Sequence, residues 1–515
     1  MKRLGWTLFY ACVFCLLIYN SFSYLDPDYG WHLAFGRHIW LTGAVPHDQI
    51  YMWTIAGQTW VDHEWLSNLI TFAVSSFSGY VGVTVFFALL PVAMLATANS
   101  YLFRSSSRPA ERIALAVFEF AAIIAMLPHL GVRMQEWTIL FFLLLLLIIE
   151  GVRRSRRWQS SLWLVPLLYA WSCLHGGFLI GIAITIGWIG YEWVLALFAK
   201  RFAWMHDQPL TVALLWKITV IAAIAIAATL ATPYGPGLYA FLSDYTQTFY
   251  VTHIQEWRSP FTVPIRYWQL GVIIATVAGA IFCRLVSKEK LPAWNIAVGA
   301  LLVIMSLKSV RHFPLFAVAT LVLIAPAIIR SLSPAWSMEL SKLNKTTATI
   351  CLAMLSVLLA IGAKITDRPF ESYCKNYPCE AARFLSEKAE YSSRLFNAYN
   401  WGGYLIGAAP DLRLFIDGRL PQYDFRGRTM LEEYVDFLSP TAEEKLSEHG
   451  IQNVLIETSP SMPKLDWFER VILGYRDDQF TPNTSLIDYL SESPDWSIVY
   501  EDAISRIYSR NNYAR

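Results

Sequence analysis

The chain has 515 residues, of which 55% are hydrophobic and only 16% are charged, and its mean hydropathy is +0.40. A soluble enzyme of this size usually carries about a quarter charged residues, so the composition excludes an ordinary soluble protein. The net charge is only +2 and no basic tract suits nucleic acid, so we expect no nucleic-acid partner. Long apolar runs through the first 363 residues instead predict a polytopic α-helical membrane protein.

These apolar runs predict about eleven membrane spans. The first run follows Lys2 and Arg3 and has the outline of a signal peptide. Its small residues at 21–23 form only a weak cleavage site and many spans follow, so we interpret it as a retained span. The predicted spans lie at residues 5–24, 82–103, 113–130, 136–152, 160–175, 178–199, 213–232, 267–285, 293–308, 313–330 and 346–363.

The loops between these spans predict the orientation of the chain. Lysine and arginine residues gather in the loops at 104–112, 153–157, 200–201, 288–290 and 330–345, which all fall on the same side as Lys2 and Arg3. Cytoplasmic loops carry such an excess of basic residues. We therefore expect a cytoplasmic N-terminus and an extracytoplasmic segment from residue 364 to residue 515.

The long outer loop at residues 25–81 contains two short helical patterns. Leu66–Phe77 is apolar but only about twelve residues long, and a span needs about 20. Counting it as a span would also move the basic loop at 104–112 outside. We predict a helix on the membrane surface that ends at Gly79, and a second one at Tyr29–Leu41. A reentrant hairpin is the alternative.

The last part of the chain differs in charge from the rest. Residues 364–515 hold 24 acids and 17 bases, a net charge of −7, whereas the first 363 residues have a net charge of +9. This contrast predicts a membrane domain at 1–363 followed by an extracytoplasmic domain at 364–515. A helix from Pro378 to Phe384, strands at 412–416, 453–456 and 497–500, and helices at 428–437 and 441–449 predict a small α/β domain.

Two cysteines of this last part, Cys374 and Cys379, would form a disulfide in an oxidising compartment. The sequence does not give their geometry, so the pairing stays open.

A cluster of acids follows the first span closely, at Asp26 and Asp28, and again at Asp62, His63 and Glu64. Carboxylates are costly to hold near lipid, so a function should require them. One of them can act as a general base toward a bound hydroxyl. Two or three carboxylates with an imidazole can instead hold a divalent cation. The plainest alternative is a set of solvated loop charges.

A second group of candidates is cationic and lies near the outer ends of the predicted spans. Such cations can bind a lipid phosphate or stabilise a phosphate leaving group. Simpler interpretations exist for several of them. Arg133 would pair with Glu136, His175-Gly176-Gly177 would allow close helix packing, and Lys308 and Arg311 would extend to the membrane surface. The group consists of Arg133, His175, Arg258, Lys308, Arg311 and His312.

Two further segments have two interpretations each. Glu256 and Arg258 form an ion pair within their loop or contact substrate. Trp401 and Tyr404 stack on a sugar ring or belong to the core of the last domain. The sequence does not decide between these.

With Asp26-Pro27-Asp28 directly after the first span, the chain resembles the multi-span glycosyltransferases of the GT-C fold. This class includes the protein O-mannosyltransferases and the lipid A aminoarabinose transferase. In this resemblance Asp28 matches the base of the family, and Asp62-His63-Glu64 falls where a second acidic motif lies. Asp28 is followed by Tyr29, where the family has glutamate.

The chain is also similar, over almost its whole length, to a group of bacterial membrane proteins of uncertain function. The shared segments are Asp-Pro-Asp-aromatic-x-Trp-His, Trp-x-x-His-Glu-Trp-Leu, His-Gly-Gly, Trp-Gly-Gly-Tyr-Leu and Asp-Gly-Arg. This resemblance places the chain in a bacterial inner membrane with its last domain in the periplasm.

The resemblance implies transfer of a sugar from a polyprenyl-phosphate donor to a glycan, lipid or protein acceptor on the extracytoplasmic side, with membrane lipid as a further partner. It implies Asp28, Asp26 and Glu64 as catalytic residues. Substrate contacts would come from Asp62, His63, Arg133, His175, Glu256, Arg258 and Arg311. Some members of the class use a divalent metal, Mg or Mn, for which Asp28 and Glu64 are the candidate ligands. The alternatives are a transporter or flippase of lipid-linked glycans, or a non-catalytic envelope assembly protein.

Overall fold

The computed structural model describes residues 2–102, 109–198, 207–244, 248–262, 268–285, 291–332, 373–419, 423–460, 464–471 and 474–511. The chain forms two compact units. The helical unit comprises Met1–Phe22, Tyr80–Pro236 and Ile265–Asp367. The mixed unit comprises Ser23–Gly79, Gly237–Pro264 and Arg368–Arg515. The sequence predicts a division near residue 363, whereas the structure groups the loop after the first span with the last part of the chain.

The helical unit consists of helices whose apolar residues run along most of their length. Its elements are α1 (Lys2–Ser23), the second part of α3 (Trp65–Leu102), α4 (Pro109–Met126), η1 (Leu127–His129), α5 (Gln135–Ser155), η2 (Trp158–Trp163), α6 (Leu164–Leu174), α7 (Phe178–Phe198), α8 (Val212–Ala228), η4 (Thr229–Ala231), α11 (Trp268–Leu285), α12 (Ala293–Lys308), η6 (Val310–His312), α13 (Phe313–Ala319), η7 (Thr320–Ile324) and α14 (Ala325–Leu332).

Among the described residues, 7 helices are long and apolar enough to cross a membrane, and two shorter apolar helices accompany them at Gln269–Cys283 and Ala293–Lys308. The prediction of a polytopic helical membrane protein is therefore confirmed. The predicted span at 160–175 is a 3₁₀ turn, η2, followed by the short helix α6. The predicted span at 346–363 lies outside the described residues, so the count of eleven stays a prediction.

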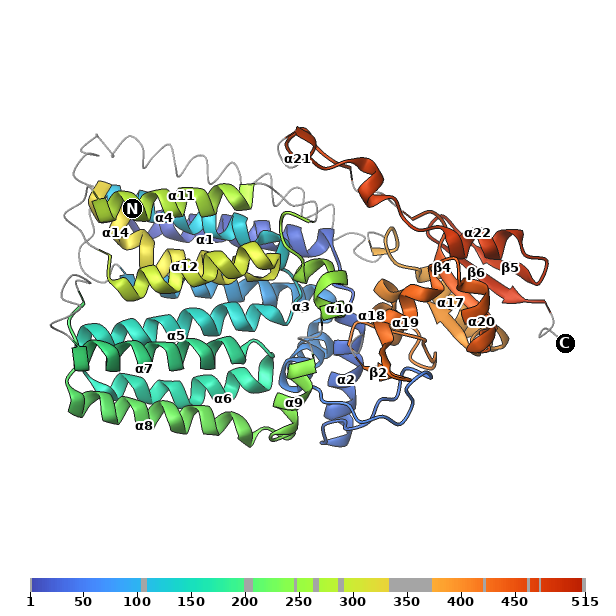
Figure 1. Ribbon diagram of the computed structural model, residues 1–515, viewed down its shortest axis with the longest axis horizontal. Coiled ribbons are helices and arrows are strands. Elements are labelled where there is room, and N and C mark those ends of the chain that lie inside the picture. Colours follow the sequence, from blue (N-terminus) through green and yellow to red (C-terminus); the bar gives the residue numbers. More distant parts are fainter. Residues whose placement is uncertain are drawn as a thin grey trace. The chain divides into compact units, whose positions relative to one another are not determined.

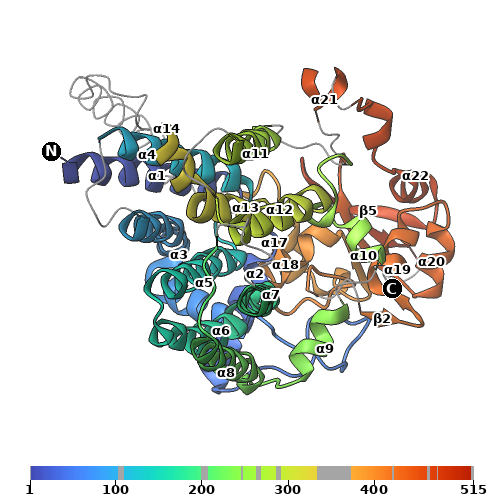
Figure 2. The same cartoon turned by 60° about the vertical axis from the view of Figure 1, so that its left-hand side comes forward.

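The core of the helical unit is the continuous helical run from Val310 to Ser331, which is almost wholly buried. Helices α4, α5, α11 and α12 pack around it, and Figure 2 brings α12, α13 and α14 into view. Figure 1 shows α5, α6, α7 and α8 lying side by side. Apolar side chains on the outer helices, such as Val220, Ile274 and Ile304, are exposed. Such a surface suits contact with lipid.

Helix α3 is interrupted at Gly79, which has φ 62° and ψ −165°. Only glycine adopts this backbone conformation without a steric penalty. The prediction that the helix beginning near Leu66 ends at Gly79 is therefore confirmed. The part of α3 before this break belongs to the mixed unit and the part after it belongs to the helical unit.

The mixed unit combines helices with a small sheet. Its elements are α2 (Tyr29–Thr42), the first part of α3, α9 (Gly237–Asp244), α10 (Thr248–His253), η5 (Gln255–Trp257), α17 (Cys379–Glu387), η9 (Ala389–Tyr391), β1 (Leu395–Asn397), η10 (Tyr399–Trp401), α18 (Gly402–Ala408), β2 (Asp424–Phe425), β3 (Arg428–Thr429), α19 (Met430–Phe437), α20 (Ala442–Glu448), β4 (Asn453–Glu457), α21 (Trp467–Val471), η11 (Asp477–Phe480), α22 (Ser485–Glu492), β5 (Trp496–Glu501) and β6 (Ser505–Arg510).

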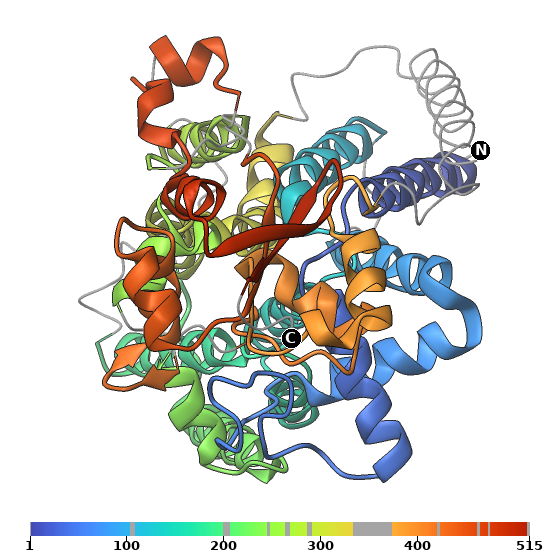
Figure 3. The ribbon, with the colours of Figure 1, turned by 90° about the vertical axis from the view of Figure 1, so that its right-hand side faces the viewer.

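The main sheet has the strand order β1-β4-β6-β5. Strand β4 pairs parallel with β1 and antiparallel with β6, which pairs antiparallel with β5. Figure 3 shows the two C-terminal strands, drawn in red, beside each other. The predicted strands at 453–456 and 497–500 and the predicted helices at 428–437 and 441–449 are present as β4, β5, α19 and α20. The prediction of a small α/β part at the end of the chain is therefore confirmed.

The predicted strand at 412–416 is wrong, because only Leu414 forms an isolated bridge, with Met52. The side chain of Asn397 takes the place of a neighbouring strand. Its Oδ1 accepts the amide of Phe415 at 2.9 Å and its Nδ2 donates to the carbonyl of Ile416 at 2.9 Å. Extended backbone can therefore be buried here without a ladder, since its polar groups are satisfied by a side chain.

Replacing Asn397 by alanine should destabilise the protein by about 1–3 kcal/mol, because buried backbone groups of Phe415 and Ile416 lose their partners. Thermal unfolding in detergent checks this. Asn483→Ala is the matched control, because Asn483 is exposed and bonds only to its own turn. Equal melting temperatures for the two variants would contradict the assignment.

The pairing of Cys374 with Cys379, which the sequence leaves open, is present as a disulfide. Disulfides persist in oxidising compartments such as the bacterial periplasm.

Candidate functional site

The turn Asp26-Pro27-Asp28 begins helix α2. The amide of Asp28 donates to Oδ1 of Asp26 at 2.9 Å, and the carbonyl of Asp28 accepts the amide of His32 at 3.1 Å. An aspartate at this N-cap position usually accepts a bond from the first helical turn. The Asp28 side chain makes no such cap bond. Its carboxylate therefore does not cap the helix.

The Asp28 carboxylate lies against the turn Asp417-Gly418-Arg419. A Cβ atom built on Gly418 would be only 2.4 Å from Oδ1 of Asp28. Helices α2 and α18 approach equally closely, because a Cβ on Gly30 would be 2.2 Å from the carbonyl oxygen of Gly403. Glycine at these positions lets two segments from opposite ends of the sequence meet at one carboxylate.

The surroundings of Asp28 favour its neutral form. Burial raises its pKa to about 7, and the negative charges of Asp26, Glu256 and Asp417 act in the same direction. A carboxylate with a pKa near neutrality is matched to the task of a general base. The structure therefore brings three predicted acids, Asp26, Asp28 and Glu256, into one electrostatic neighbourhood.

A buried ion pair between Arg419 and Asp417 stabilises the Asp417-Gly418-Arg419 turn. The guanidinium of Arg419 donates from Nε to Oδ1 of Asp417 at 3.0 Å and from Nη2 to Oδ2 at 2.7 Å. Both side chains are almost fully buried. The guanidinium also lies over the rings of Phe35 and Trp60, with its central carbon 4.7 and 4.8 Å from the ring centroids. Because a bidentate pair fixes both partners, it holds the backbone of Gly418 in place.

A second polar cluster lies one helical turn further along α2. Nδ1 of His32 is 2.6 Å from Oδ1 of Asn68, and Nδ2 of Asn68 donates to the Asp62 carboxylate at 2.8 and 2.9 Å. Asn68 thus accepts from His32 and donates to Asp62, which assigns the proton of neutral His32 to Nδ1. Oε2 of Glu64 is 3.9 Å from the same Nδ1, and Oε1 of Glu64 is 3.6 Å from Nε2 of His63.

Burial controls the charge of this second cluster. It lowers the pKa of His32 to about 3 and raises the pKa of Asp62 to about 7. His32 is therefore neutral at physiological pH. Three of the predicted residues, Asp62, His63 and Glu64, thus surround a histidine that the sequence analysis did not select.

Asp62 should make stability depend on pH. Its folded-state pKa of about 7 lies above the ordinary value of 3.8, so the folded state holds the proton more tightly than the unfolded state. Its contribution is complete at low pH and is lost as the pH rises through about 7. As the pH rises from about 4 to above 7, the melting temperature of Asp62→Asn should therefore fall less than that of the wild type. Thermal unfolding in detergent at several pH values tests this, with the exposed Asp48→Asn as control. Parallel curves for the wild type and Asp62→Asn would contradict it.

The loop that carries Glu256 and Arg258 is part of the same unit. Nη2 of Arg258 donates to the carbonyl of Thr262 at 2.7 Å, within its own loop. Glu256 contributes negative charge at Asp28. Glu256 thus acts on the acid cluster through its charge, whereas a substrate contact by Arg258 stays a prediction.

The other predicted cations, Arg133, His175 and Arg311, belong to the helical unit. Nδ1 of His175 accepts the amide of Gly177 at 2.9 Å and lies 2.7 Å from Oγ1 of Thr138. His175 therefore shapes the turn between α6 and α7. Arg133 lies in the turn before α5 and Arg311 in η6. Phosphate binding by these three residues stays a prediction.

Among the described residues, one acid and imidazole group brings its ligand atoms within 4.8 Å of one another, at Glu433, Glu448 and His449. Nζ of Lys445 already lies 2.9 Å from Oε1 of Glu433 and 3.0 Å from Oε2 of Glu448. Arg428 also pairs with Glu433 and Arg426 with Glu448, so these cations neutralise the two acids, and we interpret the group as an ion-pair network. The predicted ligands Asp28 and Glu64 do not belong to such a group in the described part of the chain.

Comparison with known proteins gives the fold. No family model and no curated protein matches the chain. Three solved structures of the oligosaccharyltransferase from Archaeoglobus fulgidus do match. The apo form has a TM-score of 0.52 and 11% identity, over 87% of this chain and 69% of that chain. The complex of AglB with an inhibitory peptide and a dolichol-phosphate has a TM-score of 0.55 and 10% identity, over 100% of this chain and 75% of that chain. The form tethered to an acceptor peptide with the NVT sequon has a TM-score of 0.52 and 12% identity, over 89% of this chain and 69% of that chain.

The chain has the GT-C fold. The predicted resemblance to this class is confirmed at the level of the fold, whereas the likeness to one group of bacterial proteins stays a prediction. The match to the GT-C structures extends over both units of the chain.

Several residues of the site were missed from the sequence, namely His32, Asn68, Asp417, Gly418 and Arg419. The signals were present in part. The Asp-Gly-Arg segment and the histidine of the first motif both belong to the shared segments quoted above. Nothing in a single sequence, however, connects the Asp-Gly-Arg turn with Asp28.

Proposed function

We propose that the chain is a membrane glycosyltransferase that transfers a sugar from a polyprenyl-phosphate donor to an acceptor on the extracytoplasmic side. The observation that carries this proposal is the position of the Asp28 carboxylate. It is free of the helix cap, lies against Gly418, and has a pKa of about 7 among other acids. The GT-C fold supplies the class of chemistry.

Asp28 is the proposed base, and Asp26 is the alternative, since its carboxylate accepts the Asp28 amide. The base takes the proton of the acceptor hydroxyl or amide as the oxygen or nitrogen of that group bonds to the anomeric carbon. The bond from this carbon to the phosphate oxygen breaks, and its electron pair leaves with the polyprenyl phosphate. One displacement of this kind inverts the configuration at the anomeric carbon.

The departing phosphate is a weak base, with a second pKa of about 6, so it departs without a strong general acid. Cations near it would stabilise the developing charge. Arg133, His175, Arg258 and Arg311 remain the proposed contacts for it. Asp62 and His63 remain proposed contacts for the acceptor or the sugar.

The acids around Asp28 are oxygen ligands, which Mg²⁺ and Mn²⁺ prefer. Their mutual repulsion helps to raise the pKa of Asp28, and a cation would relieve it. Glu64, the second predicted ligand, lies in the cluster around His32, and Asp28 and Glu64 do not form a ligand group in the described part of the chain. No step of the proposed reaction is therefore assigned to a metal.

The ligands of the structural neighbours support the proposed substrates. AglB was solved with a dolichol-phosphate and an inhibitory peptide, and in another form with an acceptor peptide. We accordingly propose a lipid-phosphate donor and include a peptide among the acceptors, beside a glycan or a lipid. Membrane lipid surrounds the protein as a further partner.

The proposed location is a bacterial inner membrane, with the mixed unit in the periplasm. The Cys374–Cys379 disulfide supports an oxidising compartment for this unit. The basic loops of the helical unit support a cytoplasmic side for the opposite helix ends.

The test is a transfer assay. Purified protein is incubated with labelled polyprenyl-phosphate sugars and an extract of envelope acceptors, and the label is followed into a new product. Loss of label from the lipid with gain in an acceptor supports the proposal. Movement of intact donor across a liposome membrane without transfer would indicate the transporter, and neither result would indicate an assembly protein.

A further inference from the structure

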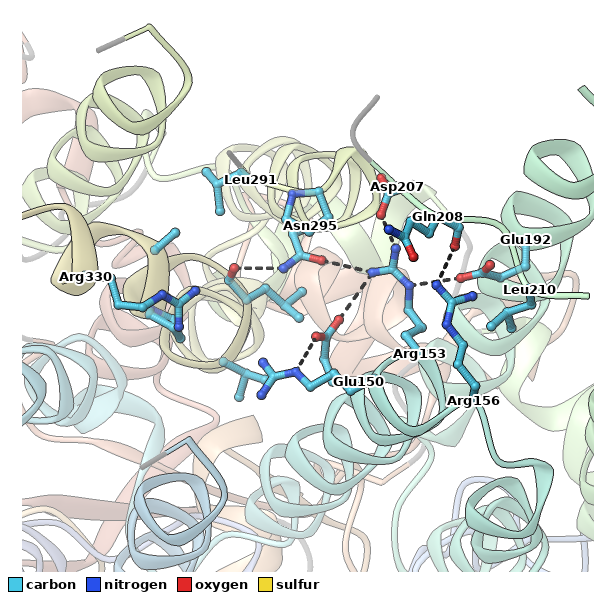
Figure 4. A pocket seen from close by; sticks show the side chains of 16 residues that line it. Glu150, Arg153, Arg156, Glu192, Asp207, Gln208, Leu210, Leu291, Asn295 and Arg330 are labelled. Atoms are coloured by element: carbon cyan, nitrogen blue, oxygen red, sulfur yellow. Dashed lines mark hydrogen bonds and ion pairs between the residues drawn. The ribbon is translucent and has the colours of Figure 1, made fainter. Parts of the chain in front are cut away.

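A polar cavity of about 400 Å³ lies among helix ends of the helical unit (Figure 4). The end of α5, the end of α7, the beginning of α12 and the end of α14 line it. At a rise of 1.5 Å per residue, α5 places this cavity about 30 Å from the turn that carries Arg133. The cavity is therefore distinct from the helix ends for which phosphate binding is proposed above.

Three carboxylates converge on a single guanidinium at the inner part of the cavity. Nε of Arg153 lies 2.9 Å from Oε1 of Glu192, Nη1 lies 3.4 Å from Oε1 of Glu150, and Nη2 forms an ion pair with Asp207. Figure 4 shows these side chains pointing toward Arg153. Arg154 also lies near Glu150, so two guanidinium groups face three carboxylates, and the inner part keeps an excess of negative charge.

The rim of the same cavity is positive. Arg154 is half exposed, with its Nε 3.5 Å from Oε2 of Glu150. Arg156 donates to the carbonyl oxygens of Gln208 and Pro209. Arg330, at the end of α14, is exposed. The remaining wall is largely apolar and consists of Leu210, Leu291, Pro292, Val322, Leu323, Pro326 and Ala327.

Glu192, which lines this cavity, has one carboxylate oxygen without a partner. Glu192 is only 1% exposed, and its Oε1 accepts from Arg153 and from the indole Nε1 of Trp188 at 3.3 Å. Its Oε2 is buried without a hydrogen-bond partner. A buried carboxylate oxygen without a donor is costly, and native proteins rarely leave one. A ligand that donates an N–H group here would satisfy it.

We propose that this cavity binds a ligand that carries a primary ammonium group beside a phosphate, as the head group of phosphatidylethanolamine does. The ammonium group donates to Oε2 of Glu192 and offsets the excess of carboxylates. The phosphate lies at the rim against Arg154 and Arg330, where charge-assisted bonds hold it. Basic pockets between membrane helices on the cytoplasmic side bind the phosphates of lipid head groups.

Other ligand classes fit less well. A purely anionic head group would meet the three inner carboxylates. A divalent metal would require ligand atoms close together, and in the described part of the chain Glu150, Glu192 and Asp207 do not form such a group. A ligand of both charges matches a negative interior with a positive rim.

Native mass spectrometry of the full chain in detergent tests this with two lipids. Phosphatidylethanolamine and phosphatidylglycerol both carry the phosphate, and only the first carries the ammonium group. We expect the first to bind about tenfold more tightly. Glu192→Gln should abolish this preference. Glu119→Gln is the matched control, because Glu119 is a buried glutamate on α4 outside the cavity, and it should retain the preference.

A second pair of variants keeps the test valid should Glu192→Gln fail to fold. Arg154→Gln changes a half-exposed rim residue and should weaken both lipids about threefold or more, because it removes a phosphate contact. Arg157→Gln, an exposed neighbour outside the cavity, should change neither. Equal binding of the two lipids, or unchanged binding in folded Glu192→Gln or Arg154→Gln, would overturn the proposal.

Competition with free phosphoethanolamine distinguishes a membrane lipid from a soluble solute that carries the same two groups. Its displacement of the bound lipid would support recognition of the head group alone, so that a soluble solute also qualifies. Retention of the lipid in its presence would support a membrane lipid as the ligand.

Discussion

Replacing Asp28 by asparagine should abolish sugar transfer without unfolding the protein. Asparagine keeps the shape of the side chain and removes the proposed base. A positioned base contributes about 10²–10⁴ to the rate, so the loss should be of that size. Stability at pH 8 should not fall, because the variant no longer has to hold an ionised carboxylate that burial and Asp26 disfavour. Transfer of labelled sugar and the melting temperature are measured on the same preparation.

The control for this variant is Asp48→Asn. Asp48 is an exposed acid of the same loop, and its replacement should leave both transfer and stability unchanged. Full transfer by a folded Asp28→Asn protein would remove Asp28 as the base and leave Asp26 as the candidate. Loss of transfer together with a large fall in melting temperature would instead indicate a structural role.

Replacing Gly418 by alanine should also reduce transfer strongly, by about 10²-fold. The new Cβ atom would be 2.4 Å from Oδ1 of Asp28, so either the carboxylate or the turn has to move. A displacement of about 1 Å at a reacting group can cost this much rate. The added methyl group should also destabilise the protein by about 1–3 kcal/mol, because it enters a closely packed contact.

The matched control is Gly237→Ala. Gly237 begins helix α9 of the same unit, and a Cβ atom there meets nothing within 4 Å. This variant should keep full transfer and should not lower the melting temperature, because the added methyl group meets no other atom and alanine is the better helix former. An active Gly418→Ala protein would show that the Asp-Gly-Arg turn does not position Asp28.

These variants distinguish what the sequence predicts from what only the structure shows. Local patterns predict the spans, the break at Gly79 and the strands β4 and β5, because each depends on residues close together in the chain. The segment at 412–416 was predicted wrongly as a strand for the opposite reason. Its backbone partners are the side chain of Asn397 and the bridge to Met52, which no local pattern records.

Some residues of the candidate site can likewise be predicted from the sequence, and others only from the structure. The acids Asp26, Asp28 and Glu64 are visible in the sequence because charge is unusual close to a membrane span. Gly418, which limits the space around Asp28, is separated from it by most of the chain, so periodicity and spacing carry no trace of the contact. The charge contrast between the two parts of the chain likewise predicts a separate tail, yet the tail supplies one wall of the acid cluster.

The contact between Asp28 and the Asp-Gly-Arg turn has a consequence for biosynthesis. Almost 390 residues separate the two segments, and at about 5–20 residues per second the ribosome needs about 20–80 s to reach the second after completing the first. During this interval Asp26 and Asp28 have no Gly418 beside them, and no guanidinium lies over Phe35 and Trp60. The centre is therefore assembled only at the end of translation, and a prematurely terminated chain would enter the membrane without a competent centre.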